Sequence, residues 1–197
     1  EIGAALMRET WVTDIRTWAS PDPEDDGVSL LADALSGYGR IGIPMGTESS
    51  LRMPLSDFKR LTDQVSGEIV DATPLVLSLH SHKSAAEIAL IRQMCGYACD
   101  AFDRAPALFH AGQPLIEAFR AFRIALLQAG AEDVPYVVGG AGQGGYGDVI
   151  SPPGRTPLRA GDVLMLDTGA SLNGYFCDFD RNCSIGHADD AAKRAHE

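Results

Sequence analysis

The sequence predicts two successive domains, an α/β domain over residues 1–79 and a second domain over residues 80–197 in which helices precede strands. In the first part, segments typical of helices alternate with segments typical of strands, an order that favours a layered α/β structure with crossover connections. In the second part, two amphipathic helical stretches precede three strand-like stretches. We place the boundary near residue 80, where the character changes.

The composition is that of an ordinary globular protein and excludes several classes. Hydrophobic residues make up 45% and charged residues 22% of the 197 residues, which excludes a disordered, collagen-like or coiled-coil chain. No apolar run approaches the roughly 18–20 residues that a membrane span needs, so we expect no membrane protein. The formal net charge of −11 disfavours binding to nucleic acids and to anionic lipid surfaces.

Cysteine content and the start of the chain give two further expectations. Four cysteines, at positions 95, 99, 177 and 183, are too few for a disulfide scaffold, so we expect buried free thiols. No signal peptide is recognisable, which makes the cytoplasm the expected location. The first residue is Glu1 rather than Met, and we expect the chain to be a fragment.

Residues 1–79 carry the signals of alternating strands and helices. Alternation over Trp11–Trp18 indicates a strand. The acidic run Pro21–Gly27 is expected to be a solvated helix entry, because carboxylates complement the N-terminal helix dipole. The remaining elements expected here are a helix over 28–35, a strand over 40–45, a helix after Ser56 that ends at Gly67, and a strand over 68–73.

The second half opens with a strong helix signal. Ser84 and Glu87 form the pattern of a capping box, and the apolar residues that follow recur three or four positions apart, as on one face of a long helix that ends at Pro106. A second helix is expected from Pro114 to Gly130. The elements expected after it are strands over Tyr136–Val138, Val163–Ala170 and Tyr175–Ser184, and a helix from Asp189.

Two patterns suggest binding sites but lack the context that such sites need. The stretch Gly139–Gly147 contains G-x-G-x-x-G, yet a dinucleotide site needs the last glycine to open a helix. The residues that follow, Asp148–Pro153, cannot form the first turns of a helix, so we reject an NAD site and expect a glycine-rich surface loop. His80 and His82 would face the same way on a strand, but no third ligand lies nearby, so we expect no metal there.

The most informative stretch is a predicted hairpin over 161–184. Asn173-Gly174 is a strong signal for a two-residue turn. With that turn, Asp167 faces Asp180 and Gly169 faces Asp178. Side chains alternate with period two along a strand, so the three aspartates share one face of the hairpin.

Carboxylates gathered at this range repel one another, so they either take up protons or hold a cation. Oxygen ligands suit Mn²⁺, with Zn²⁺ or Co²⁺ as alternatives. The other interpretation is an exposed hairpin face, with Asp180 paired to Arg181 or to another base. The residues alone leave both interpretations open.

Five short motifs of the second half can be compared with known families. They are Gly161-Asp162, Asp167-Thr-Gly169, Gly174-Tyr175, Asp178-x-x-Arg181, and Lys83-Ser84-x-x-Glu87-Ile88-x-x-Ile91-Arg92. Together they resemble the pita-bread metallopeptidase superfamily, which includes aminopeptidase P, prolidase, methionine aminopeptidase and the metal-free creatinase. The step of eleven residues from Asp167 to Asp178 matches the first two metal ligands of that family.

The resemblance implies a fold and a metal centre. The fold would be a creatinase-type, ribonuclease-H-like α/β domain over 1–79, then the N-terminal half of an α+β pita-bread catalytic domain over 80–197. Two divalent ions (Mn, Co or Zn) would be held by two Asp, one His and two Glu. Asp167 would be a bidentate ligand of one ion and Asp178 would bridge both, whereas Asp180 and Arg181 would have supporting or structural roles.

Two departures from the family pattern bear on function. The His and both Glu ligands are expected beyond Glu197, so this chain alone is expected to be inactive. Ile150 stands where the family usually has a His that orients the substrate. No catalytic side chain is assigned.

The function implied is a metal-dependent peptidase of the Xaa-Pro aminopeptidase or dipeptidase type, a homodimer with a peptide or small amide as substrate. One alternative is a creatinase-like or ectoine-hydrolase-like enzyme that splits a small C–N bond. Another is an inert fragment that acts only in self-association.

Overall fold

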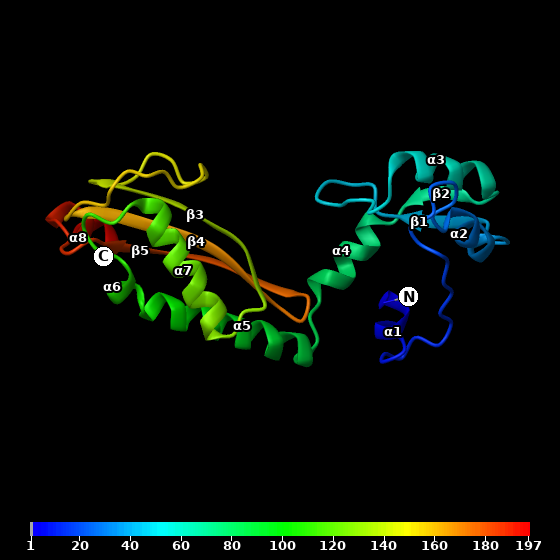
Figure 1. The fold of residues 1–197 in the computed structure, drawn as a ribbon, viewed down its shortest axis with the longest axis horizontal. Coiled ribbons are helices and arrows are strands. Elements are labelled where there is room, and N and C mark those ends of the chain that lie inside the picture. The colour runs from blue at the N-terminus through cyan, green and yellow to red at the C-terminus, as the bar shows by residue number, and fades with distance from the viewer. Residues whose placement is uncertain (1) are drawn as a thin grey trace. The chain divides into compact units, whose positions relative to one another are not determined.

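Two compact units make up the computed structural model, which describes residues 2–197. The first unit extends to His82, and the second runs from Lys83 to Glu197. Each unit is considered on its own (Figure 1). None of the described helices combines enough length with enough apolar character to pass through a lipid bilayer.

The first unit is built on a parallel strand pair with a helical crossover. Its elements are α1 (Ile2–Met7), α2 (Val28–Leu35), β1 (Arg40–Ile43), α3 (Leu55–Gln64), β2 (Glu68–Asp71) and α4 (Thr73–Ser81). β1 pairs with β2 so that Arg40 lies opposite Glu68, and α3 connects the two strands. Val28 and Ala32 of α2 pack with Leu61 of α3 in a small core. The expected α/β arrangement is confirmed.

The strand expected over Trp11–Trp18 is wrong. In the described part of the chain, no backbone hydrogen bond joins these residues to another segment. Trp11 is 90% exposed and Trp18 is 48% exposed. The alternation of residue types therefore did not indicate a buried face, because a strand needs a neighbouring strand and a surface to cover.

The acidic run before α2 acts as a helix entry, as expected. The Asp25 carboxylate accepts a hydrogen bond from the backbone N–H of Ser29 at 3.0 Å, and its contacts with Ser29 lower the pKa of Asp25. Asp26 accepts a hydrogen bond from the indole N–H of Trp18 at 2.7 Å. These two carboxylates are engaged in local structure rather than gathered around a cation.

α4 was not expected, and it changes the interpretation of the two histidines before the boundary. His80 lies in the last turn of this helix, and His82 follows its end. Residues two apart on a helix do not point the same way, unlike residues on a strand. His82 Nδ1 instead lies 2.8 Å from the carbonyl oxygen of Ser78. The strand geometry assumed for a metal site is wrong.

The second unit packs helices against one face of an antiparallel sheet. Its elements are α5 (Ala85–Asp103), α6 (Ala105–Leu108), α7 (Leu115–Ala129), β3 (Asp133–Gln143), β4 (Asp162–Leu172), β5 (Tyr175–Ser184) and α8 (Asp190–His196). The strand order is β3-β4-β5, and α5 and α7 pack on the sheet (Figure 1). The core joins Met94 of α5 and Phe122 of α7 with Leu164, Leu166 and Ala170 of β4.

Three details of the second unit differ from expectation. β3 runs on to Gln143, so Gly139 and Gly140 belong to a strand and not to the expected loop; they face Leu166 and Met165 across the ladder. α5 ends at Asp103, before Pro106, which lies in the short α6. All four cysteines are free, but only Cys177 is buried; Cys95 and Cys183 are half-buried and Cys99 is exposed.

Candidate metal-binding face

The β4–β5 hairpin has the geometry that the sequence predicts. Its Asn173-Gly174 turn has φ angles of 50° and 77°, and positive φ at both positions is what a type I′ turn requires. Asp167 lies opposite Asp180, and Gly169 lies opposite Asp178. The predicted register is confirmed.

The three aspartates share the sheet face that α5 and α7 leave uncovered, which we call the carboxylate face. Thr168 and Ala170, which alternate with Asp167 along β4, are fully buried against the helices. Asp167 is half-buried, whereas Asp178 and Asp180 are exposed. One strand therefore presents a packed side and an open, acidic side.

Crowding on the carboxylate face has an electrostatic effect. Partial burial raises the pKa of Asp167, and the negative charges of Asp178 and Asp180 raise it further. A carboxylate in this position is stabilised either by a proton or by a cation. Divalent ions that accept oxygen ligands suit such a site.

The alternative of an Asp180–Arg181 ion pair is not what the structure has. Among residues 2–197, no ion pair involves Asp180. Arg181 donates to the backbone carbonyl of Asp180 at 2.6 Å, and its guanidinium lies 4.9 Å from the ring centroid of Phe179. Arg181 therefore serves the helix-covered side of the hairpin.

Tyr136 of β3 belongs to the carboxylate face, and the sequence interpretation missed it. It lies opposite Gly169 in the β3–β4 ladder, and its hydroxyl donates a hydrogen bond to Oδ1 of Asp178. Burial, this hydrogen bond and the nearby charges of Asp167 and Asp178 raise the pKa of Tyr136. Because the contact joins residues 42 positions apart, only the pairing of all three strands could have revealed it.

Other residues of the motifs stabilise the local structure. Asp162, which is buried, accepts hydrogen bonds from the Gln143 side chain at 2.5 Å and from the backbone N–H of Arg159 at 2.7 Å. It closes the turn that leads into β4. Gly161 has a φ of 88°, which favours glycine there.

The capping box of α5 also reaches the hairpin. Glu87 accepts from the backbone N–H of Ser84 at 2.6 Å and from the hydroxyl of Tyr175 at 2.7 Å. The hydrogen bond from Ser84, followed by that from Tyr175, lowers the pKa of Glu87 from 4.5 to about 2. The start of β5 is thereby linked to the start of α5.

Part of the loop between β3 and β4 returns over the carboxylate face. Gly140 shares that face with Tyr136, and a side chain at Gly140 would collide with the backbone of Asp148. Asp148 accepts hydrogen bonds from the backbone N–H groups of Ile150 and Ser151, both at 3.0 Å. The Ile150 side chain is 79% exposed.

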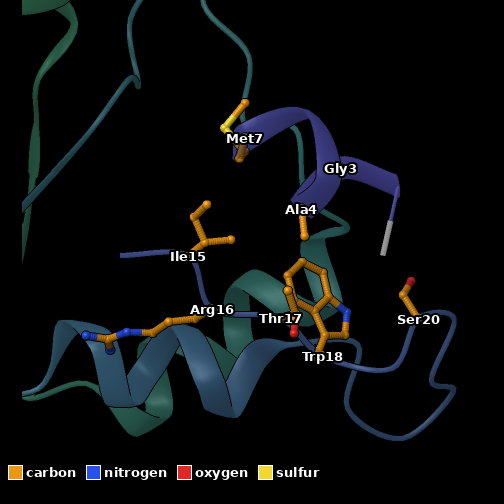
Figure 2. Close-up of a pocket in the computed structure, with 8 residues that line it drawn as sticks. All are labelled: Gly3, Ala4, Met7, Ile15, Arg16, Thr17, Trp18 and Ser20. Carbon is orange, nitrogen blue, oxygen red and sulfur yellow. The ribbon is translucent and has the colours of Figure 1, made fainter. Parts of the chain in front are cut away.

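The first unit contains a hollow of its own. Figure 2 shows it between α1 and residues 15–20, with a volume of about 380 Å³. Met7, Ile15 and Trp18 contribute apolar side chains, and Arg16 pairs with Asp14 at 2.9 Å. The described residues that line the hollow include no carboxylate, imidazole or thiol, so we assign it no reaction.

Comparison with solved structures identifies the fold. The X-Pro aminopeptidase from Thermotoga maritima MSB8 is 21% identical with a TM-score of 0.74, over 98% of this chain and 52% of that one. Prolidase from Pyrococcus furiosus is 19% identical with a TM-score of 0.76, over 98% and 54%. Dipeptidase PepE from Mycobacterium ulcerans is 25% identical with a TM-score of 0.71, over 96% and 50%. The chain thus spans about half the length of these proteins.

These similarities confirm the expected fold class, a creatinase-type α/β domain followed by part of a pita-bread domain. A search of curated proteins gave no significant match. The family model of metallopeptidase family M24 matches residues 89–197, more than half of the chain, and the match includes both Asp167 and Asp178. The chain therefore belongs to metallopeptidase family M24.

Proposed function

We propose that this chain is part of a metal-dependent peptidase that cleaves next to proline, with Asp167 and Asp178 as metal ligands. The observation that carries the proposal is the position of these two carboxylates on the open face of one hairpin, in a chain of metallopeptidase family M24. Similar structures include an X-Pro aminopeptidase and a prolidase, which supports a substrate that contains proline.

The residues present would fit a divalent cation, but they provide only part of a ligand set. Within residues 2–197, no group of three or more His, Cys, Asp and Glu side chains could hold a metal ion. Asp167 and Asp178 would supply two carboxylate ligands. Burial, followed by the charges of Asp178 and Asp180, raises the pKa of Asp167, and a nearby cation would stabilise its ionised form. Two bound divalent ions would activate a water molecule and polarise the scissile carbonyl.

The chain's own contribution is to hold these ligands in place. The packed side of β4, with Leu166 and Thr168 buried, fixes the strand, so Asp167 between them projects from a rigid support. In the proposal Asp167 and Asp178 would both hold the divalent ions through their carboxylates. Rigid placement matters because catalysis depends on where the reacting groups are held.

The test uses the whole protein that contains this chain, loaded with Mn²⁺, Co²⁺ or Zn²⁺ and assayed on Xaa-Pro dipeptides and on longer peptides with proline second. We expect cleavage next to proline and its loss in Asp178→Asn. Asp190→Asn is the matched control, because this exposed aspartate lies on α8, outside the carboxylate face. Uncut Xaa-Pro peptides, together with no effect of Asp178→Asn, would contradict the proposal.

One observation favours a second candidate function, the hydrolysis of a small C–N bond as in creatinase-like or ectoine-hydrolase-like enzymes. The exposed Ile150 side chain offers no hydrogen-bonding group where the resemblance places a substrate-orienting His. Asp148 does not replace it freely, because its carboxylate already accepts two backbone N–H groups. Small amidines and cyclic amino acid derivatives, assayed beside the peptides, separate the two functions by which class is hydrolysed faster.

A further inference from the structure

We propose that Tyr136 is a positioning residue that fixes the Asp178 carboxylate for metal binding across the bare backbone of Gly169. The inference rests on the proposed metal role of Asp178 and adds a residue to it. Tyr136, Gly169 and Asp178 are aligned on three neighbouring strands, Tyr136 opposite Gly169 and Gly169 opposite Asp178.

The distance between the outer strands explains why a tyrosine is needed. Neighbouring strands lie about 4.8 Å apart, so the backbones of Tyr136 and Asp178 are separated by roughly twice that distance. A side chain on the middle strand would normally stand between them. At Gly169 none does, and the phenol ring crosses the gap to place its hydroxyl on Oδ1 of Asp178.

Aromatic rings from both neighbouring strands fill the space that a side chain at Gly169 would occupy. A Cβ atom there would lie 2.7 Å from Cε1 of Tyr136 and would also collide with the ring of Phe176. The rings of Tyr136 and Phe176 have centroids 6.2 Å apart and are tilted by 48°. Aromatic rings that cover a strand glycine pin the register of a sheet, so the phenol is held in its position by packing as well as by its hydrogen bond.

The consequence for Asp178 is a fixed orientation. Tyr136 donates a side-chain hydrogen bond to Oδ1 of this carboxylate, and the carboxyl of Asp167 lies beside it on the same face. Asp178 is otherwise an exposed side chain that could adopt several rotamers. Hydrogen bonds of this kind orient metal ligands, and their loss typically weakens metal binding about 10- to 100-fold.

The hairpin offers a matched control. Tyr175 donates its hydroxyl to a carboxylate as well, that of Glu87 at 2.7 Å, but it does so toward α5 and away from the carboxylate face. Tyr136→Phe and Tyr175→Phe therefore remove the same group and the same type of hydrogen bond from two sides of one sheet.

The experiment uses the whole protein that contains this chain, as wild type, Tyr136→Phe, Tyr175→Phe and Asp178→Asn, and it has two readouts. The first is the ¹³C chemical shift of the Asp178 side-chain carboxyl in metal-free protein, assigned by its loss in Asp178→Asn. The second is Mn²⁺ affinity, from the electron paramagnetic resonance signal of free Mn²⁺. We expect Tyr136→Phe to move the Asp178 signal and to weaken Mn²⁺ binding roughly 10-fold, and Tyr175→Phe to do neither.

A double variant tests whether Tyr136 acts through Asp178. In the Asp178→Asn background, Tyr136→Phe is expected to cause no further loss of Mn²⁺ affinity. A further loss as large as in the wild type, or an Asp178 signal that does not move, would overturn the inference. If the wild type binds no Mn²⁺, the metal role fails and this inference fails with it. Mn²⁺ binding in the wild type without an effect of Tyr136→Phe refutes the inference alone.

Discussion

The two faces of the β3–β4–β5 sheet share one backbone but differ in what their side chains contact. Leu166 and Ala170 are buried against α5 and α7, whereas Asp167 and Gly169, which alternate with the buried residues along β4, lie on the uncovered side. Packing against the helices stabilises the residues on the covered face. On the carboxylate face, the main interactions are charge repulsion and the contacts of two aromatic rings. Period-two alternation thus separates the residues that stabilise the sheet from those proposed to act, and substitutions of neighbouring residues can test that separation.

The largest effect is expected on the packed face. Leu166→Ala removes a side chain that is 1% exposed and leaves a cavity beneath α5 and α7. We expect the free energy of unfolding to fall by about 2–5 kcal/mol, measured by urea denaturation. A loss below about 1 kcal/mol would show that this face is less tightly packed than the structure indicates.

A smaller loss in the free energy of unfolding is expected at Gly169, which lies on the carboxylate face beneath two aromatic rings. Gly169→Ala places a Cβ against the rings of Phe176 and Tyr136, and such overpacking typically costs about 1–3 kcal/mol. Denaturation of Gly169→Ala, Phe176→Ala and the double variant forms a thermodynamic cycle. Because Phe176→Ala removes one of the two obstacles, the effects should be non-additive, with the double variant less destabilised than the sum. Additive losses would contradict the contact.

The hairpin and Tyr136 also show how much of the site could be predicted from the sequence alone. The hairpin, its register and the shared face of three aspartates were predictable, because Asn173-Gly174 encodes the turn locally and alternation does the rest. Tyr136 was not, because its contact with Asp178 depends on the pairing of β3 with β4, and no local pattern encodes that pairing. Local signals also failed where tertiary structure decides, as at Trp11–Trp18, which alternates but pairs with no strand within residues 2–197.

A pH-dependent contribution is expected where the hairpin meets α5. Hydrogen bonds from Ser84 and Tyr175 lower the pKa of Glu87 to about 2, so the ionised form is favoured in the folded protein. Since the folded pKa lies below the ordinary value of 4.5, this stabilisation is present in full above pH 4.5. It is lost as the pH falls toward 2.

Thermal unfolding of wild type and Glu87→Gln at a series of pH values measures this contribution. The midpoint of Glu87→Gln should be lower at pH 7, and the difference should shrink below pH 4.5. Glu117→Gln, in the first turn of α7, is the control for loss of a helix-terminal charge. A difference that stays constant down to pH 2.5 would show that ionisation of Glu87 does not matter.

The smallest effect on stability is expected at Asp167, the residue next to Leu166 in the sequence. Asp167→Asn alters the residue beside Leu166, but on the carboxylate face, where burial and the charges of Asp178 and Asp180 disfavour the ionised form. Removing that charge should change the free energy of unfolding by no more than about 0.5 kcal/mol, in the stabilising direction, while Mn²⁺ affinity falls. If Asp167→Asn destabilised the metal-free protein as much as Leu166→Ala does, Asp167 would be a structural residue, and the separation of the two faces would be wrong. A stable variant that no longer binds Mn²⁺ would instead show that this aspartate is retained for the ion, at a small cost to the fold that holds it.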